Sequence, residues 1–260
     1  MSGPPGFGGF SNHGIGKQFV PTMIAAVAAG YWWDRSIYSG LGTAGFRIPE
    51  RNGNATFDLV QATVGAQPIA GVGYLRYPAT LGHDATAGAV AEGWTTKTTV
   101  CQWRRWPNNI VLTASKTVPL ISHYGGGGAR RFMLGGVTNA GATLRQIRGI
   151  YSNDGSSVAQ YFWSPTFDTD WHFDRWTIDT TLTGTLRMRY WLDRIEQSAV
   201  APPSGGTPLF NGLAPIESAG NAALSVITPD TVDLGNSYIF PGEPTADEET
   251  LLMGYNSPKV

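Results

Sequence analysis

The segment from Thr169 to Ser198 constrains the fold more than any other part of this chain. Its first half alternates with a period of two, which assigns Trp171, Phe173, Arg175 and Thr177 to one face of a strand and His172, Asp174, Trp176 and Ile178 to the other. A polar turn from Asp179 to Gly184 follows, and a second alternating run extends from Thr185 to Leu192. Two alternating runs around a turn of Asp, Thr and Gly residues predict an antiparallel β-hairpin.

The remainder of the chain extends this prediction to an all-β domain. The sequence has 260 residues, with Gly 34, Pro 17 and only 14% charged residues, a profile typical of short strands joined by turns. Further strand-like runs are Thr95–Trp106, Ile110–Thr113, Val118–His123, Arg131–Leu134, Leu144–Tyr151, Val158–Trp163 and Thr231–Phe240. The tetraglycine Gly125–Gly128 lacks the spacing of a phosphate-binding loop, which favours a hairpin tip. The apolar run Pro21–Trp33 is either a short helix or a first strand.

The two ends of the chain differ from its middle. Residues 1–20 are rich in Gly and Pro and predict an extended arm. Residues 21–260 are expected to form a single β-sandwich domain. Phe7, Phe10 and Phe19 give the arm apolar anchors for a partner or neighbouring subunit; the alternative is an arm folded back over its own domain. At the other end, Thr245–Met253 predicts a short helix, with Thr245 and Glu248 as a capping box.

Three motifs, in the same order along the chain, resemble laminin-G-like domains of the concanavalin A-like lectin and glucanase class found in tailed-phage virion proteins. The first is the pattern of Trp171, His172, Tyr190 and Asp193, in which Arg194 stands where the family usually has Gly. The second comprises Asn52–Ala55, Gln61–Thr63, Gln67–Pro68 and Leu75–Tyr77. The third is the final strand with its C-terminal helix. The resemblance covers about residues 30 to 255.

This resemblance implies a two-sheet antiparallel jelly-roll sandwich with an N-terminal arm and a short C-terminal helix. It also implies a non-enzymatic structural protein of a phage virion, made in the host cytoplasm, as a head decoration, fibre or tail-associated protein. Its partners are then other virion proteins, with host-surface glycan as a further candidate, and it is expected to be a homo-oligomer. We expect the arm to anchor the protein to the particle while the sandwich faces outward. The alternatives are a carbohydrate-binding module and a glycan hydrolase.

Net charge, the N-terminal sequence and cysteine content argue against several classes of function. A net charge of -1 argues against sequence-independent nucleic-acid binding. The N-terminal sequence lacks the pattern of a signal peptide, and Met23–Trp33 is too short to span a bilayer, so we expect no membrane partner. Cys101 is the single cysteine, which excludes an intrachain disulfide, and its alternating apolar surroundings favour a buried core residue over a catalytic thiol.

No catalytic residues are predicted. Glycosidases need two carboxylates that flank the scissile bond, and the related glucanases carry them in a Glu-x-Asp-x-x-Glu run that this chain does not have. The nearest acidic clusters are Asp168–Asp170 with Asp174, and Asp247–Glu249. A Gly-x-Ser-x-Gly elbow is also missing. His172 is therefore interpreted as a partly buried, hydrogen-bonded structural residue rather than a base.

Two binding hypotheses remain. Relatives of the resembled class often hold one Ca²⁺ at a loop rim, and Asp154 is the candidate ligand, although Asn153-Asp154-Gly155 is more simply a hairpin turn. No other cofactor or metal is predicted. Sugars are bound by exposed aromatic faces in a groove, for which the candidates are Trp32, Trp33, Trp94 and Trp106. Because adjacent strand residues point to opposite faces, Trp32 and Trp33 are both buried only if both faces of their sheet are covered.

Overall fold

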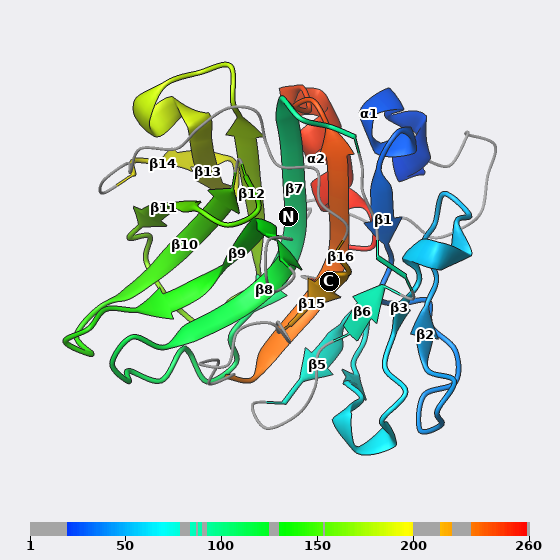
Figure 1. Cartoon of the computed structure of the whole chain (residues 1–260). Coiled ribbons are helices and arrows are strands. Elements are labelled where there is room, and N and C mark those ends of the chain that lie inside the picture. The colour runs from blue at the N-terminus through cyan, green and yellow to red at the C-terminus, as the bar shows by residue number, and fades with distance from the viewer. Residues whose placement is uncertain are drawn as a thin grey trace, which may run out of the picture.

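The protein is a two-sheet β-sandwich (Figure 1). The computed structural model describes residues 20–78, 84–86, 88–89, 93–124, 130–152, 154–199, 214–219 and 230–258. The first sheet has the order β14-β13-β12-β7-β16-β5-β4, with β1 also paired to β16, and the second has the order β11-β10-β9-β8-β15-β6-β3-β2. Every strand pairing between these elements is antiparallel. The predicted all-β, two-sheet antiparallel sandwich is thus confirmed.

The elements have the following bounds. The first sheet contains β1 (Tyr31–Trp33), β4 (Ile69–Ala70), β5 (Leu75–Tyr77), β7 (Lys97–Arg105), β12 (His172–Asp179), β13 (Met188–Leu192), β14 (Ile195–Gln197) and β16 (Val232–Pro241). The second contains β2 (Arg47–Ile48), β3 (Leu59–Val60), β6 (Asp84–Thr86), β8 (Thr117–Tyr124), β9 (Arg130–Thr138), β10 (Arg145–Ser152), β11 (Val158–Trp163) and β15 (Ile216–Ser218). The α-helices are α1 (Ala25–Ala28) and α2 (Ala246–Gly254), and the 3-10 turns are η1 (Pro21–Met23), η2 (Ala55–Phe57), η3 (Val64–Ala66) and η4 (Gly184–Arg187).

The hairpin predicted from the alternating segment is formed by β12 and β13. Its register places Trp176 opposite Tyr190, and β12 pairs on its other side with β7. The second strand begins at Met188 rather than Thr185, because Gly184 takes a positive φ of 58° and the chain first makes the 3-10 turn η4. The alternation itself is preserved, so one face of β12 points into the sandwich and the other points away from the second sheet.

Most of the other predicted strands are present with ends within two residues of those expected, although β9 extends four residues beyond Leu134. Ile110–Thr113 is an exception, because this run forms a loop between β7 and β8. Asn109 adopts a positive φ of 56°, and the backbone N–H of Val111 donates to Asp230 instead of a neighbouring strand. The run Pro21–Trp33 combines both expected alternatives, since η1 and α1 precede β1. Gly125–Gly128 and residues 1–19 lie outside the described part of the chain.

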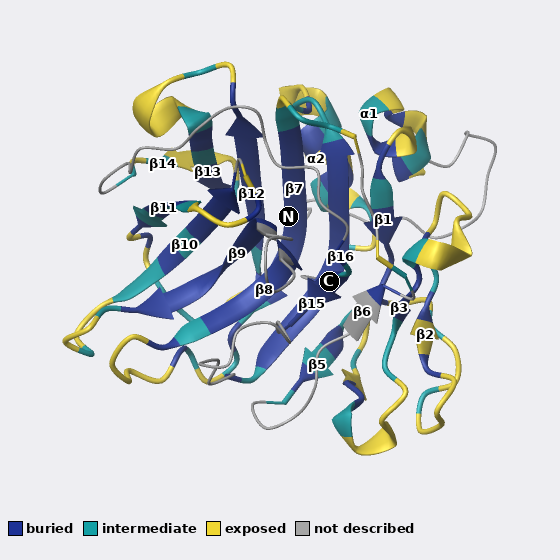
Figure 2. Cartoon of the chain, in the orientation of Figure 1, coloured by how far each residue is buried: buried dark blue, intermediate teal, exposed yellow. Residues whose placement is uncertain are grey.

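The main core fills the space between the sheets. Figure 2 shows the central strands of both sheets buried along most of their length. Large apolar side chains from each sheet meet there, among them Trp33, Leu120, Phe132, Tyr161, Trp163, Trp176, Tyr190 and Ile239. Burying such side chains supplies the main stabilising term of the fold, at about 25 cal/mol per Å² of apolar surface.

A second apolar cluster covers the outer face of the first sheet. It contains Ile24, Val27, Trp32, Cys101, Trp103, Trp171, Phe173, Tyr238, Phe240 and Leu252. Ile24 and Val27 come from α1 and its approach, and Leu252 comes from α2, which packs against the sheet (Figure 1). Both faces of β1 are therefore covered, as the adjacent Trp32 and Trp33 require. The second sheet covers the inner face, and α1 and α2 cover the outer face.

Helix α2 begins as predicted. The side chain of Thr245 accepts a hydrogen bond from the backbone N–H of Glu248, and the Glu248 carboxylate accepts one from the backbone N–H of Thr245. This is a complete capping box. Within the described residues, no helix is long and apolar enough to cross a membrane.

Candidate functional site

Two of the four motif residues, His172 and Asp193, meet at one end of the first sheet. His172 opens β12, and Asp193 follows β13 directly. The Nδ1 atom of His172 lies 2.7 Å from Oδ2 of Asp193, and its Nε2 atom lies 2.8 Å from Oδ1 of Asp168. Asp193 also accepts a hydrogen bond from the backbone N–H of Phe173 at 2.9 Å. Asp193 and Arg194 both have positive φ. They therefore join β13 to β14 in a tight turn, although Arg194 stands where the resembled family usually has Gly. The predicted hydrogen-bonded role of His172 is confirmed.

Tyr190 belongs to a buried ion pair behind this cluster. Arg104 Nε lies 2.7 Å from Asp174 Oδ2, and the Tyr190 hydroxyl donates to Asp174 Oδ1 at 2.6 Å. Burial raises the pKa of Asp174, although the Arg104 guanidinium opposes the shift. Burial works against the charge of Arg104 as well, but the Asp174 carboxylate and Tyr190 together outweigh it and the pKa of Arg104 is raised. Trp171 does not join these polar groups, because it lies in the outer apolar cluster.

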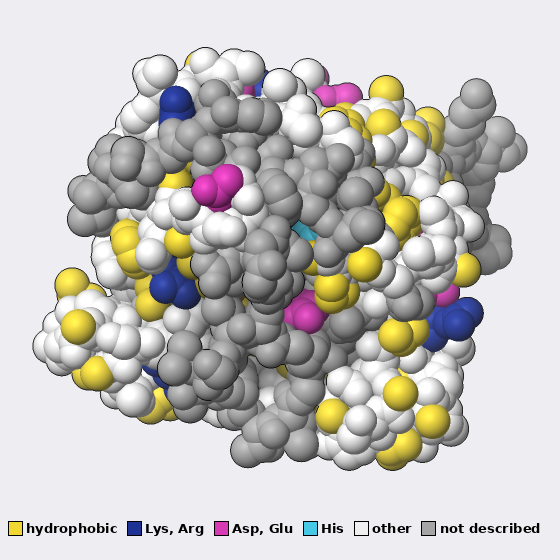
Figure 3. Space-filling model, in the orientation of Figure 1, with side chains coloured by type: hydrophobic (Ala, Val, Ile, Leu, Met, Phe, Trp, Pro, Cys, Tyr) yellow, Lys and Arg dark blue, Asp and Glu magenta, His cyan; other side chains and the backbone are white. Residues whose placement is uncertain are grey.

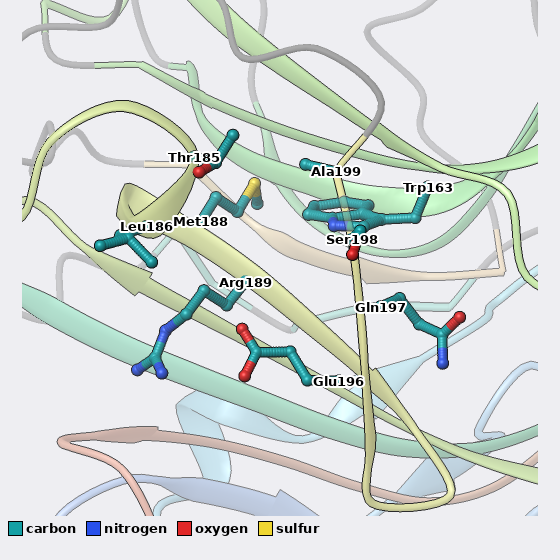
Figure 4. A pocket seen from close by; sticks show the side chains of 9 residues that line it. All are labelled: Trp163, Thr185, Leu186, Met188, Arg189, Glu196, Gln197, Ser198 and Ala199. Atoms are coloured by element: carbon teal, nitrogen blue, oxygen red, sulfur yellow. The ribbon is translucent and has the colours of Figure 1, made fainter.

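A cavity lies at the β14 edge of the first sheet. Its volume is about 220 Å³. The described residues that line it are Trp163, Thr185, Leu186, Met188, Arg189, Glu196, Gln197, Ser198 and Ala199 (Figure 4). They come from the end of β11, from η4, from β13 and from β14 with the residues after it. Trp163 and Met188 are fully buried on the core side, where Figure 4 shows Ser198 and Thr185 next to them, and Leu186 is exposed.

The charges in the cavity have opposite signs. Arg189 donates from Nη2 to Oε2 of Glu243 at 2.8 Å, and its guanidinium lies 4.8 Å from the centre of the Trp191 ring. Figure 4 shows the Glu196 carboxylate on the same side of the cavity as Arg189. The cavity therefore has one cationic donor, Arg189, and one anionic acceptor, Glu196. Charged side chains are also sparse and scattered on the face of the molecule shown in Figure 3.

The aromatic residues predicted to bind sugar are mostly in the interior. Trp32, Trp33 and Trp106 are at most 1% exposed, which corrects their assignment as an exposed binding surface. Trp33 packs between the sheets, Trp32 packs in the outer cluster, and Trp106 stacks on Phe167 at 5.6 Å between ring centres. Trp94 is half-buried beside Tyr31. Alternation alone could not show that both faces of the first sheet are covered.

Asp154 is engaged in its own turn. Its Oδ1 atom accepts hydrogen bonds from the backbone N–H groups of Ser156 at 2.8 Å and Ser157 at 2.6 Å. These bonds lower the pKa of the Asp154 carboxyl. The turn interpretation therefore accounts for this residue, and the described residues contain no group of three or more His, Cys, Asp or Glu side chains placed to hold a metal ion.

Cys101 and the arm complete the predicted sites. Cys101 is buried in the outer cluster, and burial raises the pKa of its thiol well above the usual value, so the predicted core role is confirmed. Phe7, Phe10 and Phe19 lie outside the described residues, and their anchoring role stays a prediction. The sequence gives no sign of the cavity, because its lining residues come from β11, β13, β14 and η4, which meet only in the folded protein.

Comparison with known proteins shows a likeness of fold. No family model matches the chain, and no curated protein matches it. Among solved structures it is similar to Trypanosoma rangeli sialidase in complex with sialic acid, with a TM-score of 0.59, 13% identity and coverage of 89% of this chain and 34% of that chain. It is also similar to the botulinum neurotoxin serotype D ligand binding domain in complex with N-acetylneuraminic acid, with a TM-score of 0.56, 8% identity and coverage of 89% and 52%.

The binding domain of botulinum neurotoxin serotype D/C VPI 5993 is similar as well, with a TM-score of 0.57, 9% identity and coverage of 90% and 53% of the two chains. This chain spans about a third of the sialidase and about half of the neurotoxin domains. At these identities the likeness shows a shared β-sandwich fold. The neighbours are a sialidase and two neurotoxin binding domains, and the likeness to them extends to the fold alone.

Proposed function

We propose that this chain is a non-enzymatic carbohydrate-binding β-sandwich that holds a neutral sugar ring in the cavity at the β14 edge. The observation that carries the proposal is the composition of this cavity. Leu186 supplies an exposed apolar side chain at the rim, Met188 and Trp163 lie buried on the core side, and Arg189 and Glu196 supply a charged donor and a charged acceptor. A sugar ring has both an apolar face and a rim of hydroxyls, so it matches a site of this kind.

The size of the cavity favours a single ring or the end of a chain. Its volume of about 220 Å³ is below the ~300–1,000 Å³ typical of sites for drug-sized ligands. Gln197 and Ser198 add uncharged polar groups to the wall. Each hydroxyl of a bound ring would exchange a hydrogen bond with water for one with these side chains, so affinity for one ring is expected to be modest.

Charge argues for a neutral sugar over an acidic one. Glu196 lines the cavity, and Glu243 is already bound to the Arg189 guanidinium at 2.8 Å. A sugar carboxylate would meet two carboxylates and a guanidinium that is partly neutralised. It would therefore be repelled more strongly than a neutral ring. This separates the proposed ligand from the N-acetylneuraminic acid in the neurotoxin domain that shares the fold.

The test is binding of neutral monosaccharides and of N-acetylneuraminic acid, measured by calorimetry and by ligand-observed NMR. We expect neutral sugars to bind with Kd values of about 1 mM, which is about −4 kcal/mol, and the acidic sugar to bind more weakly. Glu196→Gln and Gln197→Ala are expected to weaken neutral-sugar binding by about tenfold each, because the first removes the charge of an acceptor and the second removes a polar side chain from the cavity wall. Asp170→Asn, an exposed acid away from the cavity, is the control and should leave affinity unchanged.

Two results would overturn the proposal. One is the absence of binding to every neutral sugar in the set, and the other is binding that both cavity variants leave intact. Release of reducing sugar from a glycan substrate would contradict the non-enzymatic part. Among the described residues that line the cavity, Glu196 is the single carboxylate, whereas glycosidases generally use a pair. The placement of the protein on a phage particle rests on the sequence resemblance alone.

A further inference from the structure

The ring of His172 lies between two carboxylates. Nδ1 is 2.7 Å from Asp193, and Nε2 is 2.8 Å from Asp168. A neutral imidazole carries one N–H group and one lone pair, so it donates to only one of the two acids. The protonated ring donates from both nitrogens, and it is therefore the form that satisfies both contacts.

The other charged groups around the ring act in both directions, because the two carboxylates raise the pKa of His172 and the Arg104 guanidinium lowers it. Arg104 projects from the adjacent strand β7, directly across from His172 in the register, and it is paired with Asp174. Asp168 approaches from the segment before β12, and Asp193 approaches from the end of β13. Leu234, which lies across from Arg104 on β16, adds no charge. Three carboxylates thus face one guanidinium, and a protonated His172 reduces the excess of negative charge.

The two acids are held to very different degrees. Asp193 is fixed by two hydrogen bonds to the Phe173 backbone. Its carboxylate accepts one from the Phe173 N–H, and its own backbone N–H donates the other to the Phe173 carbonyl. Asp168 lies four residues before His172 in a segment that is buried at Pro165 and Trp171 and exposed or half-buried between them, and its carboxylate contacts His172 and the nearby backbone N–H of Asp170. The contact with His172 therefore ties residues 164–171 to β12.

This segment covers part of the core. Phe167 stacks on Trp106 with 28° between the ring planes, and its carbonyl accepts a hydrogen bond from Asn109 at 3.5 Å. Trp106 is fully buried beneath it. We propose that His172 is a proton-controlled latch: the protonated ring binds Asp168 and holds residues 164–171 over Trp106, and loss of the proton releases the segment while Asp193 keeps the ring in place.

The electrostatics of the cluster agree with this direction. The hydrogen bond to Asp193 raises the pKa of His172, although partial burial opposes the shift. Partial burial would raise the pKa of Asp168, but hydrogen bonds from His172 and the backbone of Asp170 lower it. A raised histidine pKa means that the contact is fully present below the usual value of about 6.5 and is lost as pH rises through the folded-state value. The latch is therefore closed below the usual histidine pKa and opens as pH rises through the raised folded-state pKa of His172.

Imidazole NMR on the full chain tests the protonation state. The His172 signals, assigned by comparison with His172→Gln, should titrate above the ordinary histidine value of about 6.5, and both ring nitrogens should be protonated at about pH 6. A His172 that titrates at or below the ordinary value overturns the proposal. So does a ring that is neutral at about pH 6.

Hydrogen exchange tests the release of the segment. Protection factors corrected for intrinsic exchange should fall by about tenfold in residues 164–171 between about pH 6 and about pH 9, while those of β12 stay constant. In Asp168→Asn the amide side chain can accept from the protonated ring or donate to the neutral one, so the pH dependence should disappear with the segment still held. Asp170→Asn is the matched control and should retain it. Protection that does not change with pH in the wild-type chain, or that still changes with pH in Asp168→Asn, overturns the latch.

Discussion

Buried charges in this sandwich are kept by specific partners. Arg104 and Asp174 have side chains that are 1% and 0% exposed, and they are joined at 2.7 Å. Taking both charges out of water is costly, and their mutual attraction with the hydrogen bond from Tyr190 offsets that cost. Losing one partner is therefore expected to destabilise the fold by more than the intact pair stabilises it.

Asp174→Asn should destabilise the protein strongly, because it leaves the Arg104 guanidinium buried without a counter-charge. We expect the free energy of unfolding to fall by about 3–5 kcal/mol, measured by denaturant titration. In the double variant Arg104→Gln with Asp174→Asn, no uncompensated charge remains and Tyr190 can still donate. The double variant should be more stable than the sum of the two single losses by about 1 kcal/mol or more. Additive losses would show that the two side chains are not coupled.

At the level of strands and helices, local sequence carries most of the information. The β12–β13 hairpin and the start of α2 are both predicted, because a period of two and a capping box depend on residues that are close in sequence. Ile110–Thr113 is predicted wrongly because a short apolar run does not reveal where its backbone N–H groups bond. The N–H of Val111 bonds to Asp230, which is distant in sequence.

Thr245→Ala should weaken α2 by removing its cap. The Thr245 hydroxyl accepts from the backbone N–H of Glu248, and its loss is expected to cost about 1 kcal/mol of unfolding free energy in thermal or denaturant melts. Thr250→Ala in the same helix is the control. Its hydroxyl makes only a local bond to the Ala246 carbonyl at an exposed position, and a change within about 0.5 kcal/mol is expected. Equal losses in both variants would argue against a role for the cap.

Gly30 marks the close approach of the α1–β1 connection to β16. A methyl group at Gly30 would overlap the backbone carbonyl of Ile239 and lie 2.7 Å from the Cα atom of Phe240, neither of which can rotate away. Gly30→Ala is expected to lower the free energy of unfolding by about 3 kcal/mol, as overpacking against a rigid neighbour does. At Gly65 the same methyl group meets nothing within 4 Å. Gly65→Ala should be nearly neutral, and an equal loss there would contradict the steric explanation.

The complete fold has more layers than its sequence indicates. The first sheet is buried on both faces, by the second sheet on one side and by α1 and α2 on the other. Its outer cluster takes up Trp32, Trp103 and Tyr238, which would otherwise form an exposed aromatic surface. This arrangement explains why so many of the chain's aromatic residues are structural.

Two adjacent leucines of α2 test this covering layer. Leu252 is fully buried in the outer cluster, while Leu251 is 44% exposed. Leu252→Ala should lower the free energy of unfolding by about 2–5 kcal/mol and increase binding of a hydrophobic dye, because it opens a cavity above the sheet. Leu251→Ala should change stability by about 0.5 kcal/mol or less. A Leu252→Ala variant as stable as Leu251→Ala would show that α2 does not hold the outer layer together.

The amino-acid sequence on its own determined the all-β class, the hairpin, the final strand, the capped helix and the pairing of polar against apolar faces. These follow from local periodicity and local hydrogen bonding. The tertiary structure decided that both alternating faces of the first sheet are covered, and it moved Trp32, Trp33 and Trp106 from the predicted binding surface into the interior. It also brought Asp168 and Asp193 to either side of His172 and assembled the cavity from β11, η4, β13 and β14. Such sites depend on contacts between elements, and a periodic pattern contains no record of them.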